Sequence, residues 1–263
     1  MEIKLQGAKN VRDLCDIPLS NGRKIKKGRI IRSSNLSSIT DSDIEALLCY
    51  NIKKIVDFRT EAEIKEAPDK EIFGAEWLFN PILKALTIGT TRKDNYKREL
   101  SEIFLDFTIE LGETAPEWLA ELYVPLVSDN FSLGYYKKFL DTLKSNKSGA
   151  VLYHCSAGKD RVGVGTMLVL LILGAEFEAI LEDYLITNQS YRSIIDEAIL
   201  LGRERGINEE IIKVIGAVNG VDASYLKRAY DIILSSGGIE KFLLDKLGID
   251  DCYIREFREN YLE

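Results

Sequence analysis

Residues 149–175 constrain the fold of this chain more than any other segment. The run GAVLYHC has the length and composition of a buried strand. A short polar loop, SAGKD, follows it, and residues 162–175 then have the composition of a buried helix. These residues are too few to span a bilayer, which needs about 20. The order strand, loop, helix predicts a parallel sheet layer covered by helices.

Strand and helix patterns also alternate through the first third of the chain. Asn21-Gly22 predicts the turn of a hairpin. Thr40 and Asp43 predict the start of a helix with a capping box. IKKIVDF predicts a strand that ends near Asp57, and a charged helical segment follows, ending before Pro68. We therefore expect an α/β arrangement.

The rest of the chain is mostly helical in pattern. LGYYKKFLDTLKS predicts an amphipathic helix, and about 90 residues at the end carry helical patterns broken at glycines. Residues 84–127 hold apolar side chains at roughly helical spacing, as in a helical insertion that either packs on the core or forms a lid. We expect residues 1–263 to form one domain, with a central, largely parallel sheet of four or five strands flanked by helices.

Charge and cysteine usage exclude several classes of partner. The formal net charge of −7 argues against non-specific nucleic-acid binding. The four cysteines form no CxxC motif and His154 is the single histidine, so we expect no disulfide framework, metal or cofactor. The first residues lack the apolar core of a signal peptide. We therefore expect no integral membrane association and a cytoplasmic location, with secretion as the alternative.

The loop between the predicted strand and helix has the residues of an anion-binding nucleophilic site. Its N–H groups and the helix N-terminus would converge on an anion. Gly158 lets the backbone approach closely, and Arg161 offers a planar fork to phosphate oxygens. Lowering the pKa of Cys155 by two units from about 8.5 would require the site to stabilise the thiolate over the thiol by about 2.7 kcal/mol. This combination favours phosphoryl transfer through a phosphocysteine.

The segment HCSAGKDRVG resembles the Cys-x5-Arg motif of protein tyrosine phosphatases. It is most similar to the AGKDR branch, which includes bacterial tyrosine/serine phosphatases with phosphoinositide activity. The resemblance extends to NVRDL, IVDFRTEAE, LGAEFEAILEDYLITN and LGIDDCYIREFRENYLE, whereas residues 84–127 match least. It implies a phosphatase-like fold. It also implies metal-independent hydrolysis of phosphotyrosine or phosphoserine proteins, phosphoinositides, or both, through a cysteinyl-phosphate intermediate.

The resemblance also implies roles for individual residues of the loop. Cys155 would be the nucleophile and Arg161 the phosphate clamp, and His154 would tune the thiolate through hydrogen bonding. Lys159 would face the substrate and recognise additional phosphates, with a solvated lysine as the alternative. The other phosphate-binding positions of the loop would be Ser156, Ala157 and Gly158.

The general acid that protonates the leaving group has several candidates, because the Trp-Pro-Asp motif of conventional members is absent. By resemblance the candidates are Asp160, which we prefer, and Asp57. An aspartate beside Arg161 could instead be only its ion-pair partner. Asp129 is a weaker third candidate.

Two departures from the family pattern affect the expected function. Val162 stands where these phosphatases usually carry serine or threonine, so hydrolysis of the phosphoenzyme should be slowed. Cys15 and Asp16 replace two glycines that are usual in the family, which implies a different turn near the N-terminus. Because of Val162 and the missing Trp-Pro-Asp motif, a phosphate-binding module that has lost turnover is the alternative function. A rhodanese-like sulfurtransferase is a third.

Basic residues bear on the choice of substrate. The segment RKIKKGR, residues 23–29, is either a solvated turn or a contact for an anionic surface. Together with Lys159 and Arg59 it favours multiply phosphorylated substrates. The acidic chain as a whole opposes strong adsorption to membranes.

Overall fold

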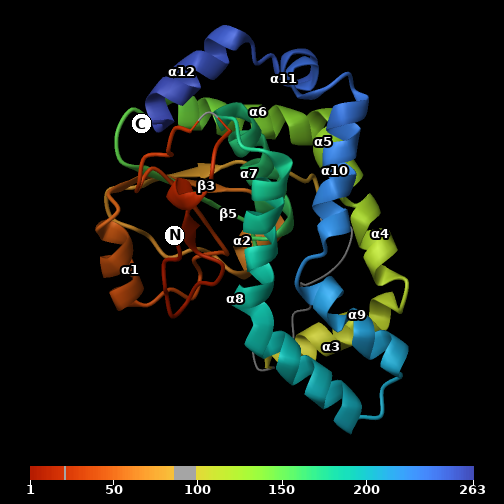
Figure 1. The fold of residues 1–263 in the computed structure, drawn as a ribbon. Helices are drawn as coiled ribbons and strands as arrows, with labels where there is room; N and C mark the ends of the chain where they lie inside the picture. The colour runs from red at the N-terminus through yellow and green to blue at the C-terminus, as the bar shows by residue number, and fades with distance from the viewer. Residues whose placement is uncertain (21, 86–98) are drawn as a thin grey trace.

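The computed structural model describes residues 1–20, 22–85 and 99–263, and within them it contains a five-stranded sheet flanked by helices (Figure 1). The spatial order of the strands is β1-β2-β5-β3-β4. Only β1 runs antiparallel to its neighbour; the other pairs are parallel. The strands are β1 (Arg12–Asp13), β2 (Ile30–Ser33), β3 (Ile52–Asp57), β4 (Glu76–Phe79) and β5 (Ala150–His154). The predicted α/β fold with a mostly parallel sheet is confirmed.

Both faces of the sheet are covered, which explains why residues 150–153 of the central strand β5 form a buried apolar run before His154. Val151 and Tyr153 belong to the large core formed with helices on one face. Ala150 and Leu152 belong to a smaller core on the other face, which includes Leu47. Successive side chains of a strand point to opposite faces, so burial on both sides requires a continuous apolar run.

The helices carry most of the remaining chain (Figure 1). Those before β5 are α1 (Asp41–Leu48), α2 (Glu61–Glu66), α3 (Leu100–Leu111), α4 (Ala115–Glu121), α5 (Tyr123–Ser128) and α6 (Asn130–Ser145), with a 3-10 turn at Leu14–Asp16. Those after β5 are α7 (Asp160–Leu173), α8 (Phe177–Glu204), α9 (Glu209–Asn219), α10 (Ala223–Ser235), α11 (Ile239–Leu247) and α12 (Asp251–Tyr261). No helix in these described ranges has the length and apolar composition needed to cross a membrane.

Several predicted elements are confirmed. Thr40 and Asp43 form the capping box of α1, because the Thr40 hydroxyl accepts from the Asp43 N–H and the Asp43 carboxylate accepts from the Thr40 N–H. The predicted buried helix is α7, whose residues from Arg161 to Leu173 are all buried. The strand that ends at Asp57 and the helix that ends before Pro68 are β3 and α2.

The predicted hairpin around Asn21-Gly22 is wrong for the described residues that flank it; Asn21 itself lies outside the described residues. Ile25 forms an isolated antiparallel bridge with Leu262, at the end of the chain. The basic segment binds the same region, since Lys26 donates to the carbonyl of Glu259 at 3.0 Å and Arg29 to that of Asn260 at 3.3 Å. Cations at the carboxyl end of α12 satisfy its last carbonyl groups.

The segment predicted to be a helical insertion contains α3, α4 and most of α5, and residues 86–98 of it lie outside the described residues. Figure 1 shows α3 and α9 beside the end of α8 that lies farthest from α12. Leu105 of α3 joins a separate apolar cluster with Tyr191 and Ile212. These helices therefore lie beyond the sheet, next to the loop that follows β5.

Candidate active site

Cys155 follows directly after β5, at the edge of the sheet where β2, β3 and β5 all end. Ser33 and Asp57 pair in register with His154 there. Cys155 is 2% exposed, and α7 begins only a few residues later. Gly158 has a φ of +66°, and a Cβ at this position would lie 2.4 Å from the carbonyl oxygen of Ser33. Only glycine allows the loop to close this tightly against the end of β2.

The loop presents its N–H groups inward because its carbonyl groups are bound from outside. The carbonyl oxygens of residues 156–158 all accept hydrogen bonds from side chains elsewhere in the fold. The donors are Asn35 Nδ2 at 2.9 Å, Tyr191 Oη at 2.8 Å, Asn10 Nδ2 at 2.7 Å and Arg32 Nη2 at 2.9 Å. In a planar trans peptide the N–H points opposite to the C=O, so the following N–H groups face the interior of the loop. Inward N–H groups arranged in this way are able to bind an anion.

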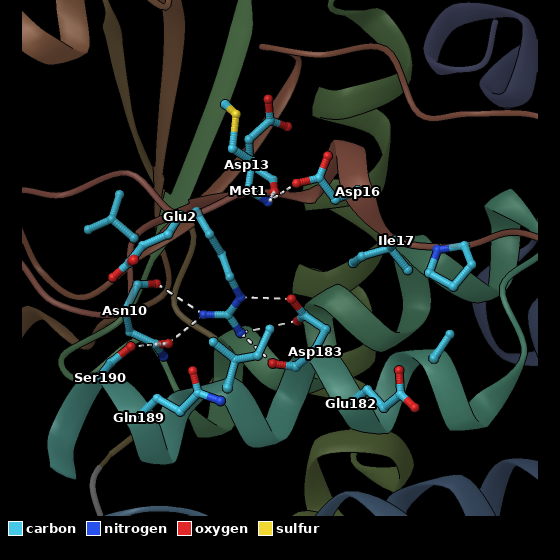
Figure 2. Close-up of a pocket in the computed structure, with 15 residues that line it drawn as sticks. Met1, Glu2, Asn10, Asp13, Asp16, Ile17, Glu182, Asp183, Gln189 and Ser190 are labelled. Atoms are coloured by element: carbon cyan, nitrogen blue, oxygen red, sulfur yellow. Dashed lines mark hydrogen bonds and ion pairs between the residues drawn. The ribbon is translucent and has the colours of Figure 1, made fainter.

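A buried ion-pair network supports the loop from behind. Arg12 Nε and Arg32 Nη1 each lie 2.7 Å from the Asp183 carboxylate of α8. Figure 2 shows Asn10 and Asp183 bound to one guanidinium group beneath the chain terminus. Burial would raise the pKa of Asp183, but the charges of Arg12 and Arg32 lower it. Sequence reasoning missed these supports, although Arg12 and Asp183 lie in segments that resemble the family.

Glu63 holds the guanidinium of Arg161, and this partner was also missed. Arg161 Nη1 and Nη2 donate to the two carboxylate oxygens of Glu63 at 2.8 Å each. The same carboxylate accepts from the N–H of Thr60 at 2.9 Å, in the capping box of α2. Burial would raise the pKa of Glu63, but Arg161 and the other donors lower it to about 2. Burial would lower the pKa of Arg161, but the charges of Cys155 and Glu63 raise it.

The two preferred candidates for the general acid lie in different places. Asp160, in the first turn of α7, is half-buried and lines the same pocket as Cys155. Asp57 is fully buried, does not line that pocket and accepts from Arg59 Nε at 2.9 Å and Nη2 at 2.7 Å. Asp129 caps α6, where its carboxylate accepts from Phe131 at 3.3 Å. The geometry therefore favours Asp160.

His154 lies behind the loop with two carboxylates. Its Nε2 is 3.0 Å from Asp69 Oδ2, and its Nδ1 is 3.8 Å from Asp57 Oδ1. Burial would lower the pKa of His154, but Asp57 and Asp69 raise it. These three residues are close enough to share a metal ion, yet Arg59 already supplies a cation that binds both carboxylates, at 2.7 and 2.8 Å. Arg59 is therefore not brought to the pocket.

Lys159 lines the pocket, but its amine caps a helix. It donates to the carbonyl groups of Val218, Asn219 and Gly220 at 3.0, 3.3 and 2.9 Å. These groups close the carboxyl end of α9, where a cation is favourable. The predicted role in recognising additional phosphates therefore competes with three existing hydrogen bonds.

The pocket above Cys155 has a volume of about 610 Å³ and a largely apolar wall. Its floor is formed by the residues from Cys155 to Arg161 that were predicted for the site, with the exception of Gly158. Its wall comes from the helices between residues 100 and 126, from residues 6–9 and 34–38, and from single residues of α8, α9 and α10. The apolar wall includes Leu83, Phe104, Phe107, Leu119, Tyr191 and Val218. A phosphate on the floor would therefore carry its organic group against aromatic side chains.

Comparisons with known proteins agree with this geometry. The model of the tyrosine phosphatase family matches residues 3–263. The chain is 26% identical to a putative tyrosine-protein phosphatase of Cupriavidus necator, over 96% of this chain and 85% of that protein. It is 24% identical to the triple specificity protein phosphatase PtpB of Mycobacterium tuberculosis, over 97% of each chain. It is 28% identical to a tyrosine-protein phosphatase of Nostoc commune, over 65% of this chain and 52% of that protein.

Proposed function

The chain belongs to the tyrosine phosphatase family, and we propose that it hydrolyses phosphomonoesters through a phosphocysteine formed on Cys155. The observation that carries this proposal is the loop whose carbonyl groups are all held from outside, beside a thiol and a fixed guanidinium group. A dianionic phosphate bound there would meet inward N–H groups, the N-terminus of α7 and Arg161 together.

The proposed reaction has two steps. The Cys155 thiolate attacks phosphorus, the bond from phosphorus to the ester oxygen breaks, and that oxygen takes a proton from the Asp160 carboxyl group. Water then attacks phosphorus, the bond from sulfur to phosphorus breaks, and the Asp160 carboxylate accepts the proton of the water. Inorganic phosphate leaves and the thiolate is regenerated. Arg161 would bind the phosphoryl oxygens with the N–H groups that Glu63 does not use.

Among substrates, we propose phosphotyrosine side chains as the preferred class. The aromatic wall of the pocket supports this, because it can enclose a phenyl ring. In the described part of the chain, several of the cations expected to favour extra phosphates have other partners: Arg59 binds Asp57, Lys159 caps α9, and Lys26 and Arg29 bind carbonyl groups at the end of α12. Activity on phosphoserine and phosphoinositides is a second proposal; the name of the triple specificity relative supports a broad choice of substrates but does not say which they are.

The test is phosphate release from a phosphotyrosine peptide, a phosphoserine peptide and a soluble phosphoinositide, with a chelator present. We expect the highest kcat/KM on the phosphotyrosine peptide. A higher value on the phosphoinositide would reverse the substrate assignment. Tight binding of phosphate without release from any substrate would instead favour the alternative, a binding module, which Val162 motivates.

We further propose that residues 1–263 act as one phosphatase domain, with residues 84–127 as an insertion that forms a wall of the pocket. Leu119 and Tyr123 support this because both line the pocket with Cys155. We also propose a reducing, cytoplasmic setting, which the four free cysteines support.

Replacing Val162 with threonine should increase steady-state turnover of an aryl phosphate several-fold. Val162 is fully buried next to Arg161 and cannot donate a hydrogen bond to the departing thiolate. The wild type should therefore show a burst of the aryl alcohol before a slower steady state, and the variant a smaller burst. Val164→Thr, at another fully buried position of α7, is the control for a buried hydroxyl. A linear wild-type time course without a burst would contradict this prediction.

Replacing Glu63 with glutamine should lower kcat/KM by about tenfold or more, since a hydrogen bond to a charged group contributes about 1.5–3 kcal/mol. Glutamine preserves the shape but can no longer accept both N–H groups of Arg161. Glu61→Gln, at an exposed position of the same helix, should leave kcat/KM unchanged. Equal activity of Glu63→Gln and the wild type would show that Arg161 does not need this partner.

The same variant has an expected effect on acid stability. The pKa of Glu63 falls from 4.5 to about 2 on folding, so its stabilisation is present above pH 4.5 and is lost as the pH falls through about 2. The shift corresponds to about 3 kcal/mol. Chemical denaturation at several pH values should therefore show that the free energy of unfolding decreases less in Glu63→Gln than in the wild type as the pH falls from 4.5 to about 2.

A further inference from the structure

Two buried tyrosines and Asp160 form a continuous line of oxygen atoms at the side of the pocket. Tyr123 Oη lies 2.5 Å from Asp160 Oδ1 and 2.6 Å from Tyr184 Oη. Tyr123 and Tyr184 are only 2% and 1% exposed. The three residues come from α5, α7 and α8, so the line joins three separate elements at one point.

The direction of the hydrogen bonds follows from the number of protons. Each phenol has one proton to donate. Tyr123 gives its proton to Asp160, so Tyr184 must be the donor in the contact between the two phenols. Burial first, and the charge of Asp160 second, raise the pKa of both tyrosines, which keeps them protonated. The line therefore runs from Tyr184 to Tyr123 to Asp160 Oδ1.

This line leaves Asp160 in a defined position. Among the described residues, Arg161 has its guanidinium bound by Glu63, and its remaining contacts are with Ser156 and a backbone carbonyl group. Asp160 is therefore not the ion-pair partner of the arginine beside it. With Oδ1 held by Tyr123, no other hydrogen bond in the described chain reaches Oδ2, and Asp160 lines the pocket.

We infer that Tyr123, supported by Tyr184, is the positioning residue for the general acid, holding Asp160 so that Oδ2 carries the proton to the leaving group. The inference rests on the proposed function. It gives the helices between residues 100 and 128 a role in the chemistry, because they supply the residue that orients the acid. In the family this acid conventionally comes from a separate loop, which this chain does not have in recognisable form.

The test uses Tyr123→Phe with two substrates that differ in their need for an acid. Phenyl phosphate releases a phenol with a pKa of about 10 and needs protonation, whereas 4-nitrophenyl phosphate releases a much weaker base. We expect kcat/KM of the variant to fall by about tenfold on phenyl phosphate and by less than about twofold on 4-nitrophenyl phosphate. The tenfold loss is only part of the roughly 10²–10⁴-fold that general acid catalysis typically contributes, because the acid itself is retained. Tyr184→Phe should show the same selectivity with a smaller loss.

Two further variants make the outcome unambiguous. Asp160→Asn should show a larger loss with the same selectivity for phenyl phosphate. Tyr261→Phe is the control, because it removes a buried hydroxyl group of α12 that donates to the carbonyl of Leu143 in α6, away from the pocket. This variant should leave both rates unchanged. If Tyr123→Phe and Tyr184→Phe lose the same activity on both substrates, or lose none, the inference is overturned. The proposed function still holds in that case if the wild type is active. No cysteine-dependent hydrolysis by the wild type would overturn both.

Discussion

Cys155→Ser should lower phosphate release by about 10³-fold or more, on the order of the losses seen when other enzymes lose their nucleophile. A serine hydroxyl is almost fully protonated at neutral pH, whereas a thiol in this loop faces inward N–H groups and Arg161. Serine is close in size to cysteine, and Cys155 is already 2% exposed, so the fold should be preserved. The phosphate site should therefore stay intact in the variant.

The matched control is Cys49→Ser, which changes an exposed free cysteine in the turn after α1. It should retain the wild-type rate. Circular dichroism and thermal unfolding of both variants establish that they are folded. Substantial phosphate release by folded Cys155→Ser would mean that another residue is the nucleophile.

Arg161→Lys should lower kcat/KM by about 10²–10³-fold, the usual cost of removing a fixed donor to developing negative charge. Lysine keeps the positive charge but has no planar fork, so it cannot bind Glu63 and the phosphate at once. Arg161 donates through both Nη atoms to Glu63, and its remaining N–H groups are fixed by that contact. The loss should therefore appear in kcat more than in KM, because the fork is needed most in the transition state.

Arg258→Lys is the control for this substitution. Arg258 also binds with its guanidinium group, donating from Nε to the carbonyl of Ile172 at 2.7 Å, but it lies on α12 away from the pocket. Its replacement should leave kcat/KM unchanged. A loss of less than about fivefold in Arg161→Lys, far below the usual cost of losing such a donor, would show that the guanidinium geometry is not required.

The parts of the fold and site that follow local rules could be predicted from sequence. The apolar strand before Cys155, the glycine at 158 and the buried helix each depend on neighbours along the chain. The capping box of α1 is equally local. Because these features depend on adjacent residues, the positions of the proposed nucleophile and of the proposed phosphate-binding loop follow from the amino-acid sequence alone.

The supporting residues could not be predicted because their contacts join distant segments. Glu63 and Arg161 are 98 positions apart, and Arg32 and Asp183 are 151 apart. The sequence offers one hint for Glu63, since Thr60 and Glu63 have the spacing of a capping box. Tyr123 lies in the segment that resembles the family least, so no motif pointed to it.

Competing partners explain the remaining differences. Asp57 does end its strand at the correct edge of the sheet, but Arg59, two residues later, binds its carboxylate. Lys159 has the position expected from the motif, but the carboxyl end of α9 binds its amine. The hairpin expected near Asn21-Gly22 is replaced by pairing of Ile25 with the end of the chain. The outcomes for Lys159 and Ile25 depend on tertiary contacts that pattern alone does not contain, whereas the pair of Asp57 and Arg59 is local.

The most direct test of the central claim is to trap the covalent intermediate. The wild type would be mixed with an aryl phosphate, denatured within the burst, digested and analysed by mass spectrometry. We expect the peptide that contains Cys155 to gain the mass of one phosphoryl group, and the same peptide from Cys155→Ser to gain none. Phosphate release by the wild type with the phosphoryl group on another residue, or on none, would contradict the mechanism.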